Sequence, residues 1–140
     1  MRVFEAETTI SATPEVVWEL LTDAPGYTSW NTTVDRVEGR IEPGGKIKVL
    51  VKINPGKAFP VRVAEFVPTE RMVWSGGMPL GLFKGVRTFT LIPSGGGTRF
   101  AMREVYSGVL APLIGRSIPD LQPAFDEFAA ALKLRAESSS

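Results

Sequence analysis

Residues 82–107 read LFKGVRTFTLIPSGGGTRFAMREVYS, two runs of alternating apolar and polar residues joined by glycines. Such alternation is typical of strands, and the segment 94–97 is typical of a tight turn, so the stretch predicts a β-hairpin. Apolar positions then match across the turn and fix the register. The predicted opposite pairs are Leu91 with Phe100, Phe89 with Met102, and Arg87 with Glu104.

A register shifted by one residue is unfavourable. It sets Arg87 against Arg103 and Leu91 against Arg99, which opposes two like charges and loses an apolar pair. In the favoured register, Arg87 and Glu104 point to the apolar side of the hairpin. Because ions tolerate burial only when they are paired, hydrogen-bonded or wetted, the pair indicates a lined cavity rather than a solid core. A pair at a wet sheet edge is the alternative.

The composition is that of an ordinary soluble globule. The 140 residues predict one domain, 1–140, with a frayed tail at about 137–140. Hydrophobic residues make up 44%, charged residues 22%, and the net charge is +1. Basic residues are scattered along the chain, so neither nucleic acid nor an anionic membrane is expected as the main partner. We expect a cytoplasmic protein without stable membrane insertion, because no signal sequence or long apolar run is present.

Cysteine and histidine are both missing from the sequence. Their absence excludes disulfides, thiolate catalysis, imidazole acid/base chemistry and zinc sites of the usual kind. Glu5 and Glu7 are the nearest approach to a carboxylate cluster, and they are more typical of a solvated strand face. We expect no metal and no cofactor.

The rest of the chain predicts a helix and a small helix near the start, then strands, then a long helix. A strand over 3–10 is followed by a helix that Ser11 or Thr13 caps and Pro14 begins, and by a short turn over 27–31. Later strands are expected over 33–38, 46–53, 59–67, 71–75, 82–92 and 98–107. In the third strand, Ile47, Val49, Val51 and Ile53 share the apolar face.

Apolar residues return to helical spacing over 109–134. Gly115, Pro119 and Pro123 break the front half, so the regular helix is expected to begin near Pro119. The apolar segment 78–83 reads either as a lip over an opening or as a strand extension.

This order of elements is an α+β helix-grip arrangement, a curved antiparallel sheet of about seven strands around a long C-terminal helix. It resembles the START/Bet v1 (SRPBCC) superfamily, in particular its polyketide cyclase/dehydrase-like branch. The resemblance covers nearly the whole chain. The residues that carry it are ISATPEVVW at 10–18 with Leu21, Asp23, Tyr27 and Trp30-Asn31, then Trp74-Ser75-Gly76, FTLIP at 89–93, GTRF at 97–100 and the stretch 104–108. This fold hosts many functions, so the resemblance is specific for the fold and weak for the activity.

The resemblance and the predicted faces together define candidate ligand-binding residues. They are Trp30, Asn31, Val49, Val51, Trp74, Arg87, Phe89, Phe100, Met102, Glu104, Tyr106, Leu121, Phe125 and Phe128. Tyr106 is expected to face Gly85, where it covers the glycine or offers its hydroxyl to a ligand. Trp18 is expected to pack the first helix against the sheet.

The leading hypothesis is a monomer or homodimer that binds a small hydrophobic molecule, lipid-, polyketide- or aromatic-like, oriented by Arg87. The first alternative is an enzyme of cyclase, dehydratase or isomerase type. Its candidate catalytic residues are Glu104 as base, Arg87 as oxyanion stabiliser and Tyr106 as proton donor. A neighbouring Arg makes a carboxylate a weaker base, which favours binding over catalysis. The second alternative is a protein-interaction or chaperone-cofactor module, for which the sequence shows no exposed apolar patch.

Overall fold

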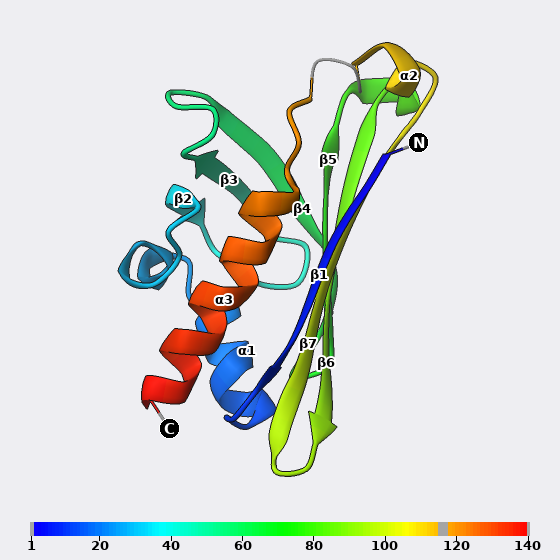
Figure 1. The fold of residues 1–140 in the computed structure, drawn as a ribbon. Helices are drawn as coiled ribbons and strands as arrows, with labels where there is room; N and C mark the ends of the chain where they lie inside the picture. The colour runs from blue at the N-terminus through cyan, green and yellow to red at the C-terminus, as the bar shows by residue number, and fades with distance from the viewer. Residues whose placement is uncertain (1, 115–117, 140) are drawn as a thin grey trace.

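Seven antiparallel strands form one curved sheet in the order β1-β7-β6-β5-β4-β3-β2 (Figure 1). The computed structural model describes residues 2–114 and 118–139. The strands are β1 (Arg2–Ile10), β2 (Val34–Gly39), β3 (Lys46–Val51), β4 (Ala58–Val67), β5 (Arg71–Gly77), β6 (Lys84–Ser94) and β7 (Gly97–Ser107). The helices are α1 (Pro14–Thr22), η1 (Pro25–Ser29), η2 (Pro79–Gly81), α2 (Ala111–Ile114) and α3 (Gln122–Ser139). This arrangement confirms the predicted α+β helix-grip class.

The β6–β7 hairpin has the predicted register. Arg87 lies opposite Glu104, and the turn closes with Ser94 opposite Gly97. Gly95 and Gly96 at its centre have φ values of 55° and 85°, the left-handed conformation that a two-residue hairpin turn requires and glycine adopts without strain. Because successive side chains of a strand point to opposite faces, this turn decides which side chains of the hairpin face the core.

Helix α1 begins as the sequence predicts. The Thr13 hydroxyl accepts a hydrogen bond from the Val16 N–H (3.4 Å), and Pro14 occupies the first turn. α1 and η1 carry the chain from β1 at one edge of the sheet to β2 at the other. Trp18 packs edge-on against Phe66 of β4 with ring centroids 5.1 Å apart, which confirms its expected core role.

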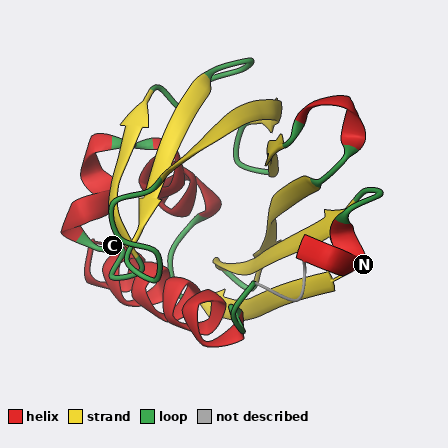
Figure 2. Cartoon of the chain, turned by 90° about the horizontal axis from the view of Figure 1, so that it is seen from above, coloured by secondary structure: helices red, strands yellow, loops and turns green. Residues whose placement is uncertain are grey.

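Helix α3 lies across the concave side of the sheet, whose curl is seen from above in Figure 2. It buries Phe125, Phe128, Ala129 and Leu132. α3 also covers the free edge of β1, because Gln122 donates to the Glu5 carbonyl (2.6 Å) and Lys133 donates to the Thr9 carbonyl (2.6 Å). Side chains that satisfy edge carbonyls in this way keep a strand from pairing with another molecule.

The C-terminal region is not one continuous helix. Two separate helices form, as the prolines in its front half predict. The short α2 follows β7, and α3 begins at Gln122. The Gln122 N–H donates a hydrogen bond to the Asp120 carboxylate (3.0 Å). Gly115, a predicted breaker, lies outside the described residues. α3 continues to Ser139, into the segment where the sequence places a frayed tail. The Glu137 carboxylate accepts hydrogen bonds from Lys133 (2.7 Å) and from the Ser11 N–H (2.9 Å), which hold the pKa of Glu137 below its ordinary value.

Two further local differences have simple causes. Ile53, expected on the buried face of the third strand, is 50% exposed because β3 ends at Val51 and the Asn54 N–H turns back to the Val51 carbonyl. The segment 78–83 is a loop around η2 and not a strand extension. Among the described residues, none of the helices has the length and hydropathy needed to span a bilayer.

Thr98 provides a test of the contact between the hairpin and α1. It is fully buried, and its hydroxyl donates to the Ala12 carbonyl (2.8 Å). We expect Thr98→Val to lower the free energy of unfolding by about 1–2 kcal/mol, because the carbonyl loses its donor in a dry site. Urea denaturation measures the loss. Thr9→Val, at an exposed position, is the control, and an equal effect of the two would contradict the assigned role.

Candidate functional site

Arg87, Glu104 and Tyr106 form a polar cluster on the concave face of the sheet. The Arg87 Nε donates to the Glu104 Oε1 (2.8 Å), and the two side chains are only 19% and 12% exposed. Phe125 of α3 lies against this pair, with the Arg87 guanidinium 4.8 Å from the ring centroid. The pair therefore lies between sheet and helix rather than in bulk solvent.

Tyr106 lies beside Glu104. Burial, followed by the Glu104 charge, raises the pKa of Tyr106 above its ordinary value. Its ring covers Gly85, where an added Cβ would lie 3.0 Å from the Tyr106 Cε1. Phe4 and Phe83 pack on the same ring at 6.2 and 5.6 Å between centroids. These aromatic neighbours thus hold the Tyr106 ring in place close to the Arg87–Glu104 pair.

An aromatic cluster adjoins these polar groups. Tyr27 contacts Trp30, Trp74 and Phe128, with ring centroids 5.0, 6.2 and 6.4 Å apart. Trp74 packs edge-on against Phe89 and lies opposite Arg87 in the β5–β6 register. The aromatic and polar groups therefore belong to one continuous surface.

Tyr27 is fully buried, and its hydroxyl donates to the Leu21 carbonyl (2.6 Å). Burial raises the pKa of Tyr27, whereas the positive charge of Arg87 opposes that shift. Tyr27 is thus a fixed neutral element between the end of α1 and the aromatic cluster.

Within the described residues, three buried N–H donors beside this surface have no hydrogen-bond partner. They belong to Trp30 Nε1, Trp74 Nε1 and Asn31 Nδ2. The carbonyl side of Asn31 is occupied, since its Oδ1 accepts from the N–H and the hydroxyl of Thr33 (2.9 and 2.6 Å). Buried donors without acceptors are rare and costly in folded proteins, so these three groups need an explanation.

The remaining candidates also lie on the concave side. Phe100 and Met102 are buried in β7, and Phe128 stacks on Phe100 with centroids 6.4 Å apart. Val49 of β3 is buried, whereas Val51 and Leu121 are half-buried. Val49 and Val51 are three strands away from Arg87 in the sheet, so they face the polar cluster across the curl rather than adjoining it.

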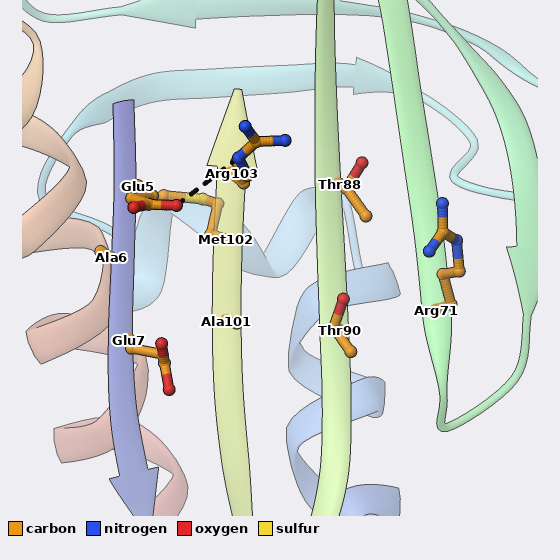
Figure 3. A pocket seen from close by; sticks show the side chains of 9 residues that line it. All are labelled: Glu5, Ala6, Glu7, Arg71, Thr88, Thr90, Ala101, Met102 and Arg103. Carbon is orange, nitrogen blue, oxygen red and sulfur yellow. Dashed lines mark ion pairs between the residues drawn. The ribbon is translucent and has the colours of Figure 1, made fainter. Parts of the chain in front are cut away.

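A pocket of about 500 Å³ opens on the other, outer face of the sheet (Figure 3). Its lining shares only Met102 with the residues proposed from the sequence. The lining residues are Glu5, Ala6, Glu7, Arg71, Thr88, Thr90, Ala101, Met102 and Arg103. Arg103 pairs with Glu5 (3.5 Å), and Glu7 pairs with Arg99. Because these ions are more than half exposed and neutralise one another, this face is a solvated one. The internal chamber expected from the sequence stays a prediction.

Sequence reasoning did not include Tyr27, Phe4 or Phe83 among the site residues. Phe4 had a signal, because it occupies an inward position of β1 directly opposite Glu104. Phe83 belongs to the apolar 78–83 segment, which pattern alone did not place. For Tyr27 the signal was weak, because a short 3-10 turn has no periodicity that shows which side chain points inward. In the described part of the chain, no acidic residues gather into a set that resembles a metal site.

Glu104 tests whether the ion pair is enclosed. We expect Glu104→Gln to lower the free energy of unfolding by roughly 2 kcal/mol, because Arg87 keeps its charge without a carboxylate. This is less than the ~3–5 kcal/mol typical of a fully buried pair, since water still reaches part of it. Glu5→Gln is the matched control, because Glu5 pairs with Arg103 at the outer face and should cost about 0–1 kcal/mol. Equal losses in urea denaturation would place Arg87 and Glu104 effectively in solvent.

Solved structures with the same fold come from several bacteria. The protein TTHA0849 from Thermus thermophilus is 22% identical over 99% of both chains, with a TM-score of 0.76. The hypothetical protein jhp0584 from Helicobacter pylori is 15% identical over 96% of this chain and 88% of that one, with a TM-score of 0.78. The di-domain ARO/CYC StfQ from the steffimycin biosynthetic pathway is 15% identical over 98% of this chain and 51% of that one, with a TM-score of 0.73. These likenesses show the fold alone.

No curated protein matches the sequence. A protein-family model, in contrast, matches residues 1–137, nearly the whole chain, and its description is polyketide cyclase / dehydrase and lipid transport. This match agrees with the helix-grip fold and with the resemblance seen in the sequence. The chain belongs to the polyketide cyclase/dehydrase and lipid transport family of SRPBCC type.

Proposed function

We propose that this protein binds a small, mostly apolar molecule with a hydrogen-bond acceptor at one end, held between the concave face of the sheet and α3. The observation that carries the proposal is the surplus of buried donors. Trp30, Trp74 and Asn31 each present an N–H without a partner, beside the surface that holds Arg87. A guest with a carboxylate, enolate or carbonyl oxygen satisfies such donors, whereas an ammonium group does not.

The Glu104 carboxylate of the cluster is already engaged within the protein. It accepts from the Arg87 Nε, and this contact orients the guanidinium. A guanidinium has several N–H donors, and the Glu104 contact through Nε accounts for one of them. Arg87 is therefore suited to hold a second oxygen-bearing group, with Glu104 positioning it.

Apolar side chains on the same concave face are only partly covered by the fold itself. Phe59 and Val61 of β4 lie opposite Val49 and Ile47 of β3, and so share their inward face, yet both are half-buried. Val51 of β3 is half-buried as well. Burying such surface contributes about 25 cal/mol per Å² of apolar area, which favours a largely hydrocarbon guest.

The family description also names cyclases and dehydrases, so catalysis by this cluster is the second candidate. In that case Glu104 acts as base, Arg87 stabilises an oxyanion and Tyr106 donates a proton. The state of both groups argues against it. Glu104 already accepts from the Arg87 guanidinium, and the raised pKa of Tyr106 makes its hydroxyl a weaker acid. Binding is therefore the function that this geometry favours.

Native mass spectrometry of protein purified from its own host identifies a co-purified guest directly. A quantitative test uses a dansyl-labelled fatty acid and its methyl ester as fluorescent probes. We expect saturable binding of the acid and about tenfold or greater weakening in Arg87→Met, because a charge-assisted hydrogen bond contributes roughly 1.5–3 kcal/mol. The ester, which lacks the charge, should respond less.

Arg103→Met is the matched control, since Arg103 lies on the outer face of β7 and is 56% exposed. It should leave both affinities unchanged. Failure of both probes to saturate, together with native spectra that show only the bare protein, would overturn the proposal. Equal weakening in the two variants would remove Arg87 from it.

A further inference from the structure

Exposed large apolar side chains gather at one end of the molecule. Among the described residues, six of the ten such side chains belong to the loops β3–β4, β5–β6 and β7–α2 or to α2 itself. We refer to them as the apolar rim. Its members are Ile53, Met78, Leu80, Leu82, Val109 and Leu113.

The strand pairings explain why these loops meet. β5 and β6 end their ladder at Gly77 opposite Lys84, and β7 ends at Ser107 opposite the same lysine. The Leu110 N–H then donates to the Leu82 carbonyl (2.8 Å), which ties the two loops together. β4 begins beside the end of β5, so the β3–β4 turn stands at the same end, seen at the upper left of Figure 1 with α2 at the upper right.

Leu80 at the tip of this rim is unfavourable for the isolated protein in two ways. Its side chain is 95% exposed, so it contributes almost nothing to the core. Its backbone has φ 60° and ψ 22°, the left-handed conformation that glycine and asparagine adopt easily and leucine does not. A strained and exposed leucine gains from burial only against something outside this chain.

Cationic side chains flank the rim. Lys52 and Lys57 are exposed in the β3–β4 turn, and Lys84 is exposed at the start of β6, directly after the η2 loop. Asp35, beside the residue that pairs with the end of β3, offsets this charge only in part. Lys84 is distant in the sequence from Lys52 and Lys57, and the fold brings the three lysines to one end.

We propose that the apolar rim docks on the surface of an anionic lipid bilayer, with Leu80 and Leu113 entering the headgroup region and the lysines contacting lipid phosphates. Apolar tips on separate loops surrounded by lysines match an anionic interface. A second copy of this chain would bring the same lysines together and repel itself. Docking goes beyond ligand binding and does not depend on it, because the unliganded protein carries the same surface.

Flotation with vesicles tests this docking. We expect the protein to float with vesicles of phosphatidylcholine containing phosphatidylglycerol, more weakly as salt increases, and to remain behind with phosphatidylcholine alone. Leu80→Asn should reduce flotation several-fold and leave the melting temperature unchanged or higher, because asparagine adopts the left-handed backbone readily. Leu134→Gln is the matched control, because Leu134 is 74% exposed in the C-terminal half of α3. This variant should float like the wild type.

Three results would overturn the proposal. The first is that the protein does not float with the anionic vesicles, and the second is that Leu80→Asn floats as well as the wild type. The third is that Leu80→Asn lowers the melting temperature, which would give Leu80 a structural role. Self-association in gel filtration that Leu80→Asn abolishes, without vesicle binding, would assign the rim to a second copy. Loss of docking leaves the dansyl-probe assay in solution unaffected, so the two proposals fail separately.

Discussion

The register of the β6–β7 hairpin is the constraint on which the rest of the structure depends. Two glycines with positive φ set a two-residue turn, and this turn decides which side chains of both strands face α3. In the register that forms, Arg87, Glu104 and Tyr106 face the helix, while Thr88 and Arg103 face solvent. A shift by one residue between the two strands would set Arg87 against Arg103 and Leu91 against Arg99, so that Arg87 would face a like charge in place of the carboxylate.

Most of the fold could be predicted because it depends on local signals. The Thr13 cap, Pro14, the alternation of 46–51 and the Gly95-Gly96 turn each act within a few residues, and each lies where pattern reasoning puts it. The ends of two elements differ from the pattern. β3 stops before Ile53 because of the local turn at Asn54. α3 runs past residue 137, where Glu137 accepts from the Ser11 N–H, more than a hundred positions earlier in the chain.

In the candidate site, too, some features follow from the sequence pattern and others depend on the folded structure. The Arg87–Glu104 pair was predictable because it rests on cross-strand matching. Tyr27 was not, since its inward direction comes from a 3-10 turn and from rings contributed by β5 and α3. The three unpartnered N–H groups and the lysine-flanked apolar rim were likewise invisible in the sequence, because they depend on which loops the sheet brings together. Scattered charge in a sequence thus says little about charge on one end of a fold.

The chain connectivity has a consequence for folding. β1 is the first strand of the sheet to be made, yet among the described strands it pairs only with β7, and Arg2 lies opposite Tyr106. β1 must therefore wait, unpaired, until the six later strands have left the ribosome, and α3, which shields its outer edge, follows all of them. Closure of so long a loop makes completion of the sheet a slow, late step. Truncated or stalled chains would present β1 as a bare strand, and they are the species most prone to pair with one another.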